Sequence, residues 1–495
     1  RHSIDLWPLI SPLGITKCLA VCRTDRNGFI VLLSEINKAM ATLRTVMPSV
    51  LVLLVMFLSS VEVKAMPSFT RQTGEPCAAC HVQAFGPGLT PFGRNFKLTG
   101  YTMAGGEDAK FIPLSAMVQG SFTHTQRSQP GGAADHFGTN NNAAMDQASI
   151  FYAGRVTSNV GAFVQTTFDG VAKTNLILDN TDIRFADQAS LAGQQFVYGI
   201  SANNSPTVSD LWNTTPAWSL PATSSALAPT PAAGTLIESL AGQVGGVTAY
   251  MMWNNLLYVE GGGYTSLPRN VQQTVNTFDP GQNRIDGGAP YWRVALQHTH
   301  NGHYGAIGSF GMQANVNPQR LQGAGTDRYT DFGFDATYQY LANLAHIFEL
   351  NGTYIRENRD LNASVALGFA EKQNGSLDTV RIRGAYTYQQ TYGLTLAYGQ
   401  TSGTADNVIH SFSDPISGSR SGKPNNQAFT AEVSYIPFGK PTSTYSSLTN
   451  LRLTLQYTHY FQFNGGIRNY DGFGRNAGGN EPLYLNGWLA FGQAG

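Results

Sequence analysis

The sequence is poor in charge and has no long apolar run. Asp, Glu, Lys and Arg make up 13% of its 495 residues, about half of the roughly 25% found in an average soluble domain. Its longest apolar stretch, residues 50–58, is much shorter than the about 20 residues of a membrane-spanning helix. Basic and acidic residues balance at 31 each, whereas a nucleic-acid-binding domain normally has a basic excess. These shortages exclude a bundle of membrane helices and argue against a nucleic-acid partner.

The short apolar stretch has the layout of a secretory signal. Arg44 precedes it, Ser59 and Ser60 follow it, and the small residue Ala65 stands before a plausible cleavage point. We therefore expect a cleaved signal peptide over residues 40–65 and a mature chain that begins at Met66; the stretch is too short for a membrane anchor. Residues 1–39 have no initiator and no sustained periodicity, so we interpret them as a non-native upstream extension and leave them out of the fold.

Cysteine is scarce, and the two cysteines of the expected mature chain form one motif. Residues 77–81 read Cys-Ala-Ala-Cys-His, the pattern that attaches a c-type haem. Cys77 and Cys80 would form thioethers with the porphyrin, and His81 would be the proximal iron ligand. A zinc site would need further ligands at matching spacing, a thioredoxin-like pair would need a βαβ unit, and a structural disulfide would leave His81 unexplained. The motif therefore predicts one covalently bound haem c.

Residues 66–110 form the expected monohaem segment. Thr90 is a good helix N-cap, Pro91 suits the first helical position, and Gly100 suits the C-terminal end. One short helix is thus predicted. Because chains below about 40 to 50 residues rarely fold without external support, we expect this segment to pack inside a larger host.

The distal iron ligand has three candidates: Met103, Met117 and His124. In the alternating stretch 114–123, Met117 falls on the polar face, which would point inward in a barrel, and His124 falls on the outward set. A methionine often only fills space. Met117 is our first choice and Met103 the second, with another ligand or an open position as the remaining alternatives.

Residues 111–495 predict an all-β domain, an antiparallel transmembrane β-barrel of the porin type. Aromatic residues reach 11%, and alternating segments repeat between clusters of Gly, Asn, Pro and Ser. Residues 451–463 are the clearest case, with apolar or aromatic residues at most odd positions and polar residues at most even ones. Counting such segments gives about 16 strands, an even number as in bacterial barrels. A soluble sandwich or propeller is the disfavoured alternative. The barrel lumen is the expected host of the haem segment.

Loop lengths and charges refine this expectation. The long irregular stretches at 127–145, 206–240, 267–290, 404–425 and 464–480 would be extracellular, and tight turns such as Asn301-Gly302 would be periplasmic. The alternation of side chains between the two faces of each strand also predicts a set of inward-facing charges. An Arg or Lys that faced lipid at mid-depth would cost about 2–4 kcal/mol. The inward-facing charges are Arg155, Arg293, Arg381, Arg383, Arg452, Asp335, Glu349 and Glu432. The arginines either bind haem propionates or form an ordinary solvated wall.

The arrangement as a whole resembles a known family. An export signal, one Cys-x-x-Cys-His motif, the runs at 89–94, 96–102 and 113–117, and a porin-like remainder are similar to the fused outer-membrane cytochrome and porin family that oxidises ferrous iron. The resemblance spans residues 66–491. It implies that a monohaem domain plugs a barrel of about 16 strands, that Cys77 and Cys80 hold the haem, and that His81 binds its iron.

The expected function follows from this resemblance. It implies an oxidoreductase of the Fe(II):cytochrome c reductase type, embedded in outer-membrane lipid, that takes electrons from extracellular Fe(II). The electrons would pass to a periplasmic c-type cytochrome or copper protein. Two alternatives stay open. One is a diffusion porin with a structural or sensory haem segment, and the other is an electron conduit that uses another donor or runs outward.

Overall fold

The computed structural model describes residues 67–105, 113–172, 176–218, 221–411, 414–443 and 449–492. The expected upstream extension, 1–39, and the expected signal peptide, 40–65, lie outside the described residues. Both of these expectations stay predictions.

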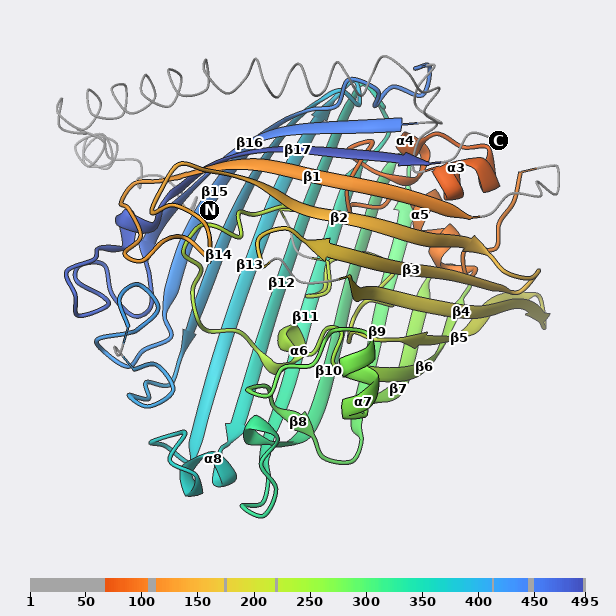
Figure 1. Ribbon diagram of the computed structural model, residues 1–495. Helices are drawn as coiled ribbons and strands as arrows, with labels where there is room; N and C mark the ends of the chain where they lie inside the picture. Colours follow the sequence, from red (N-terminus) through yellow and green to blue (C-terminus); the bar gives the residue numbers. More distant parts are fainter. Residues whose placement is uncertain are drawn as a thin grey trace, which may run out of the picture. The chain divides into compact units, whose positions relative to one another are not determined.

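The described chain forms one closed antiparallel barrel of sixteen long strands (Figure 1). The strands are β1 (Leu114–Thr125), β2 (Asn142–Arg155), β3 (Val160–Asp169), β4 (Ile177–Leu191), β5 (Gln194–Asn203), β6 (Val244–Trp253), β7 (Leu257–Ser266), β9 (Ala289–His300), β10 (His303–Asn317), β11 (Asp327–Tyr340), β12 (His346–Asp360), β13 (Asn374–Tyr388), β14 (Tyr392–Gly403), β15 (Asn426–Tyr435), β16 (Thr449–Gln462) and β17 (Pro482–Gly492). A two-residue strand, β8 (Arg284–Ile285), pairs with the end of β10. β1 pairs with both β2 and β17, which closes the ring. The prediction of about 16 strands is confirmed.

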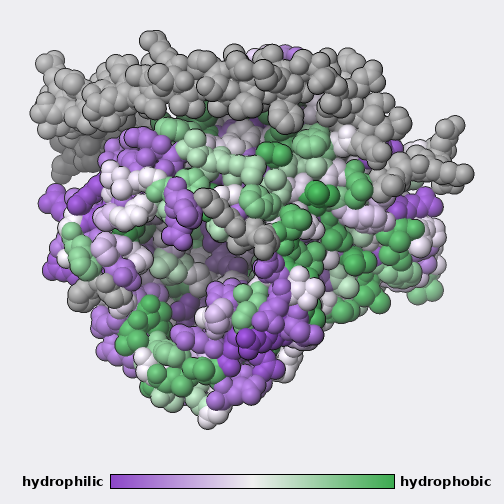
Figure 2. Space-filling model, viewed as in Figure 1, coloured by the Kyte–Doolittle hydropathy of each residue, from purple (hydrophilic) through white to green (hydrophobic). Residues whose placement is uncertain are grey.

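The alternation of residue types gives the barrel an apolar exterior and a polar interior. On β16, Leu453 and Leu455 are 41% and 44% exposed, whereas Arg452 and Thr454 are buried. Successive side chains of a strand point to opposite faces, so the exposed leucines face outward. Figure 2 shows hydrophobic residues gathered on the outer wall around β2 to β4. An apolar outer wall around a polar interior is the arrangement of an outer-membrane barrel.

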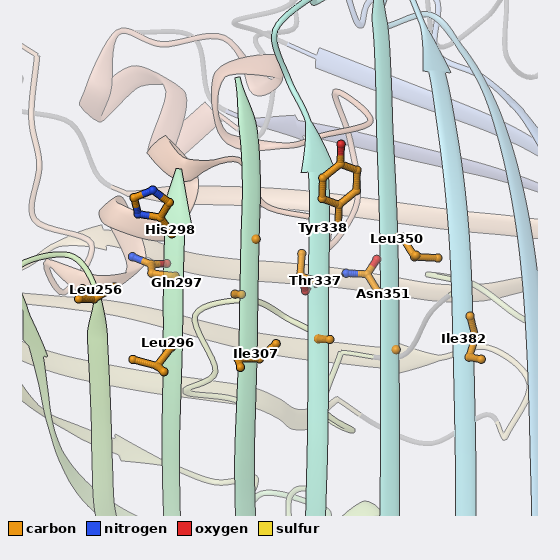
Figure 3. Close-up of a pocket in the computed structure, with 14 residues that line it drawn as sticks. Leu256, Leu296, Gln297, His298, Ile307, Thr337, Tyr338, Leu350, Asn351 and Ile382 are labelled. Carbon is orange, nitrogen blue, oxygen red and sulfur yellow. Dashed lines mark hydrogen bonds between the residues drawn. The ribbon is translucent and has the colours of Figure 1, made fainter. Parts of the chain in front are cut away.

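The outer wall also has a shallow apolar depression across β9 to β13 (Figure 3). Leu296, Ile307, Leu350 and Ile382 form its sides, and glycines such as Gly305 leave its floor low. Because these side chains point away from the lumen, the depression belongs to the lipid-facing surface.

The two ends of the barrel differ in loop length. One end carries tight turns such as Asn301-Gly302, where both residues have positive φ (48° and 78°) as a two-residue hairpin turn requires. The other end carries the long connections, and β2 begins at Asn142, a few residues before the predicted end of the first loop. Outer-membrane barrels have short periplasmic turns and long extracellular loops, so the tight-turn end is the periplasmic one.

The helices are short; three precede β1, and the others lie in connections between strands. They are α3 (Pro67–Thr73), α4 (Cys77–Cys80), α5 (Pro91–Leu98), α6 (Leu236–Ser239), α7 (Arg269–Thr274) and α8 (Asn362–Ala366), with 3-10 turns η1 (Pro318–Arg320) and η2 (Ala477–Asn480). Among the described residues, no helix has both the length and the apolar character to cross a membrane.

The predicted helix of the haem segment is α5. The Thr90 hydroxyl accepts a hydrogen bond from the Gly93 amide at 3.2 Å, Pro91 is the first helical residue, and Gly100 follows the helix end with a φ of 72°. The caps read from the sequence are therefore confirmed. The structure adds α3 and α4, which the sequence pattern did not predict.

Candidate functional site in the barrel lumen

The N-terminal segment lies in the lumen at the periplasmic end. Its contacts reach the tight-turn ends of strands all around the ring. The Ser68 and Ser115 hydroxyls are 3.3 Å apart, Arg94 donates to Gln339 at 3.0 Å, and Asn450 donates to the Ala84 carbonyl at 2.9 Å. Figure 1 shows α3, α4 and α5 in orange and red at this end of the barrel, with α3 beside the end of β17. The expectation that this segment plugs the barrel is confirmed.

The Cys-x-x-Cys-His motif forms one helical turn and the residue after it. α4 spans both cysteines, and residues three apart on a helix are neighbours on its surface. His81 then leaves the helix in an extended conformation, and its amide donates to the Cys77 carbonyl at 2.9 Å. Cys77 and Cys80 are not joined by a disulfide. The two thiols and the imidazole therefore come from one short element.

Burial controls the protonation of this motif. It raises the pKa of Cys80 to about 12, helped by the nearby Cys77 and Glu75. It lowers the pKa of His81 to about 4, against the opposing effect of the Gly86 backbone. His81 is therefore a neutral imidazole at neutral pH, the form that binds a metal ion. Its Nδ1 atom is buried without a hydrogen-bond partner.

A cavity of about 370 Å³ adjoins the motif, within the range of cofactor sites. Cys77, Cys80 and His81 line one side of it. Most of its other lining is apolar or aromatic, amide side chains such as Gln165 add polar groups, and Lys97 and Asp179 are the charged residues of the lining. The cavity, the two thiols and the unpartnered imidazole nitrogen fit a covalently attached haem c.

The structure separates the three candidates for the distal ligand. Met117 is 6% exposed, faces inward and lines the cavity. Met103 lies outside the cavity lining, and its sulfur accepts a long hydrogen bond from Asn95 at 3.6 Å. His124 lies near the far end of β1, where it contacts Asn141 at 2.7 Å. The predicted faces of Met117 and His124 are confirmed, and the ligand role of Met117 stays a prediction.

The connection between β5 and β6 fills the lumen beside the N-terminal segment. The stretch 206–240 was expected to be an extracellular loop, but much of the connection 204–243 that contains it folds inward and contacts α5. The Lys97 ammonium donates to the Val208 and Asp210 carbonyls at 2.8 and 2.6 Å and to Asn213 at 2.9 Å. Burial, with the nearby charge of Arg184, lowers the pKa of Lys97 to about 7.

The inserted connection is held by its own polar residues. The Asp210 carboxylate accepts hydrogen bonds from the amides of Trp212 and Thr214 at 3.0 and 2.9 Å. The carboxylate also accepts from the amide and the hydroxyl of Thr215 at 3.1 and 2.9 Å and forms an ion pair with Arg293 at 3.1 Å. The composition of this stretch, rich in Ser, Thr, Ala and Pro, resembles a solvent-exposed loop, so sequence reasoning missed it. Asp210 was a signal for a local turn, but it did not reveal burial.

Three of the predicted inward arginines form buried ion pairs. Arg293 pairs with Asp335 at 2.9 Å, Arg383 with Glu349 at 2.5 Å, and Arg452 with Glu432 at 2.7 Å. The inward assignment of these six charges is confirmed.

The remaining two arginines differ. Arg381 pairs with Glu238 of the inserted connection, whereas Arg155 lies exposed at the end of β2. Among the described residues, none of the five arginines lines the cavity. The interpretation that they bind haem propionates is therefore not supported by their positions. Arg383 and Arg452 instead donate to Gln83 at 3.2 and 3.3 Å, next to the haem motif.

Comparison with known proteins gives structural neighbours only. No protein-family model matches the chain, and no curated protein sequence is similar to it. Solved structures with a similar fold include OmpF of Salmonella typhi in complex with daunomycin, at 12% identity and a TM-score of 0.42, covering 76% of this chain and 97% of that one. The channel DcaP of Acinetobacter baumannii has 11% identity and a TM-score of 0.42, with 76% and 96% covered. The anion-selective porin of Comamonas acidovorans has 10% identity and a TM-score of 0.40, with 76% and 98% covered.

At such TM-scores these neighbours carry no argument of their own. The strand pairing, the apolar exterior and the loop lengths of this chain define its class. It is a porin-like β-barrel of the outer membrane.

Proposed function

We propose that this barrel is an electron conduit that oxidises extracellular Fe(II) and reduces a periplasmic electron carrier through one haem c. The observation that carries the proposal is the cavity in the lumen. It brings Cys77, Cys80 and His81 of the N-terminal segment, called the plug below, together with Met117 of the barrel wall. Two thiols and a histidine on one side and a thioether on the other are the donor set of a low-spin c-type haem.

Each residue has a distinct role in this proposal. Cys77 and Cys80 would form the covalent links, the His81 imidazole would bind the iron, and the Met117 sulfur would supply the second protein ligand. When bound there, haem c supplies a one-electron carrier whose potential depends on these ligands and on burial. The aromatic lining excludes water and lowers the local dielectric.

The placement of the site suggests which partner meets which end. The haem motif lies at the periplasmic mouth, within reach of a soluble carrier such as a c-type cytochrome or a copper protein. In each turnover one Fe(II) outside becomes Fe(III), and one oxidised carrier inside is reduced by the same electron. The insoluble ferric product then stays outside the cell. Fe(II) as the donor comes from the family resemblance, and a haem with a methionine ligand has a potential high enough to accept its electron.

A vesicle experiment tests the proposal. The haem-loaded protein is inserted into liposomes that contain oxidised cytochrome c, and Fe(II) is added outside without oxygen. We expect the trapped cytochrome to be reduced. Vesicles with the Cys77→Ala/Cys80→Ala variant, which has no covalent haem, are the control. Equal rates in both would contradict the proposal.

A diffusion porin with a structural or sensory haem segment is the second candidate. The porin-like barrel and its polar interior favour it. In the same vesicles it predicts rapid leakage of small sugars and no haem-dependent reduction inside. A conduit that uses another donor, or that runs outward, would respond to dithionite or to a reduced internal carrier but not to external Fe(II).

A further inference from the structure

We propose that Trp488 is a positioning residue for the Met117 thioether, and that its indole N–H raises the reduction potential of the site. This inference rests on the proposed function, because it takes Met117 as the distal ligand. Trp488 comes from the last strand, far from the haem motif in sequence.

The geometry places the two side chains in direct contact. β1 and β17 are neighbours, with Gln119 opposite Trp488 and Met117 opposite Ala490. Trp488 and Met117 are therefore diagonal neighbours on the same inward face. The Trp488 Nε1 atom lies 3.1 Å from the Met117 sulfur and donates a hydrogen bond to it. Both residues line the cavity.

The position of the Trp488 ring is fixed by the plug. Phe85 packs against it edge-on, with ring centroids 4.6 Å apart. The Phe85 carbonyl in turn accepts a hydrogen bond from Arg452 at 3.0 Å. The same plug residues that follow His81 thus hold the tryptophan that contacts Met117.

The hydrogen bond has two consequences for the sulfur. Methionine is flexible, with three rotatable bonds, so a fixed donor restricts where its sulfur lies. A thioether sulfur has two lone pairs. The N–H engages one of them, which leaves the other for a metal ion on the cavity side. It also withdraws electron density from the sulfur, which weakens its stabilisation of the ferric state, and groups around a ligand tune a metal centre in this way.

A second tryptophan of the cavity provides a matched control. Trp218 also lines the cavity, but its indole N–H donates to the Val208 carbonyl at 3.2 Å. Replacing either tryptophan with phenylalanine removes an indole from the same cavity. Only Trp488→Phe removes a donor to sulfur.

The test is a redox titration of the haem-loaded variants, with their absorption spectra recorded at each potential. We expect Trp488→Phe to shift the potential downward, by up to about tenfold in the redox equilibrium, or about 59 mV for one electron. Its sulfur-to-iron charge-transfer band should weaken or move. Trp218→Phe should keep the wild-type position of that band. An unchanged band and potential in Trp488→Phe, or equal shifts in both variants, would overturn the inference.

A third variant separates this inference from the proposed function. If Met117→Leu leaves the spectrum unchanged, Met117 is not a ligand and the proposed site itself is wrong. If Met117→Leu alters the spectrum but Trp488→Phe does not, only the role of Trp488 is wrong.

Discussion

The two sides of the lumen wall are built differently. β1, β2, β3 and β17 face the cavity with uncharged side chains, including Met117, Phe151 and Trp488. β9 to β16 carry buried ion pairs, such as Arg383 with Glu349 and Arg452 with Glu432. Asp146 on β2 accepts hydrogen bonds from Ser121 and Tyr484 but does not line the cavity. Among the described residues the ring therefore has a charged side with buried arginine pairs and a side whose strands line the cavity without charged residues, called the uncharged side below.

The difference shows how one barrel both anchors a plug and shapes a site. Arg383 and Arg452 hold Gln83, two residues beyond His81, so the charged side fixes the plug. The uncharged side completes the cavity. Charges next to a cofactor would shift its potential strongly in a low dielectric, and this division keeps the arginine pairs out of the cavity lining.

The largest expected effect is the loss of covalent haem from the plug. Cys77→Ala/Cys80→Ala should lose all covalent haem, because no thiol is left to form a thioether at the motif. A haem stain of a denaturing gel checks this, and the barrel should still migrate as a folded species before heating. Covalent haem retained in this double variant would show that the attachment site is elsewhere.

Removing one member of an ion pair on the charged side should lower the free energy of unfolding. Arg452→Gln leaves the Glu432 carboxylate, which is 2% exposed, without its partner, and the loss of one member of a buried pair costs about 3–5 kcal/mol. Urea unfolding in detergent measures this. Arg328→Gln is the control, since the Arg328–Asp360 pair is exposed and such pairs contribute about 0–1 kcal/mol. Similar losses in both variants would contradict the assigned anchoring role.

Changing the uncharged side should alter the spectrum rather than the stability. Met117→Leu keeps a similar volume, and such swaps usually cost less than about 1.5 kcal/mol. It removes the sulfur, so we expect a lower reduction potential or a high-spin iron spectrum. Met103→Leu should leave the spectrum as in the wild type. The reverse pattern would assign the distal ligand to Met103.

A pH-dependent effect concerns Lys97, at the contact between the plug and the inserted connection. Burial lowers its pKa from 10.5 to about 7, so between these values the unfolded chain holds more protons than the folded one. The contribution of Lys97 to stability therefore rises as the pH rises from about 7 to 10.5. The stability of the wild type relative to Lys97→Met should increase over this range in urea unfolding. Parallel pH profiles would contradict the burial of a titrating lysine.

Local patterns in the sequence were enough for the barrel and for the inner face of its strands. Alternation placed Met117 and Arg452 inward, and capping residues placed α5 after Thr90. These features depend on neighbours in the chain, such as the period of two in a strand and the side-chain cap of a helix.

Contacts between residues far apart in the sequence could not be predicted in the same way. Asn450 binds the Ala84 carbonyl, and Trp488 donates to Met117, across more than 360 residues. Closure of the ring brings Trp488 to Met117, and entry of the N-terminal segment into the lumen brings Ala84 to Asn450. The inward fold of 204–243 was missed because its polar residues find partners on other elements in the lumen, such as Arg293 for Asp210, although their composition is that of an exposed loop.

The most direct test of the central claim is stopped-flow absorbance of the haem after the oxidised protein is mixed with Fe(II) without oxygen. We expect the haem of the wild type to be reduced rapidly, and as completely as with dithionite. Full reduction by dithionite but none by Fe(II) would contradict iron oxidation as the function and would favour another donor, outward electron flow or a porin role.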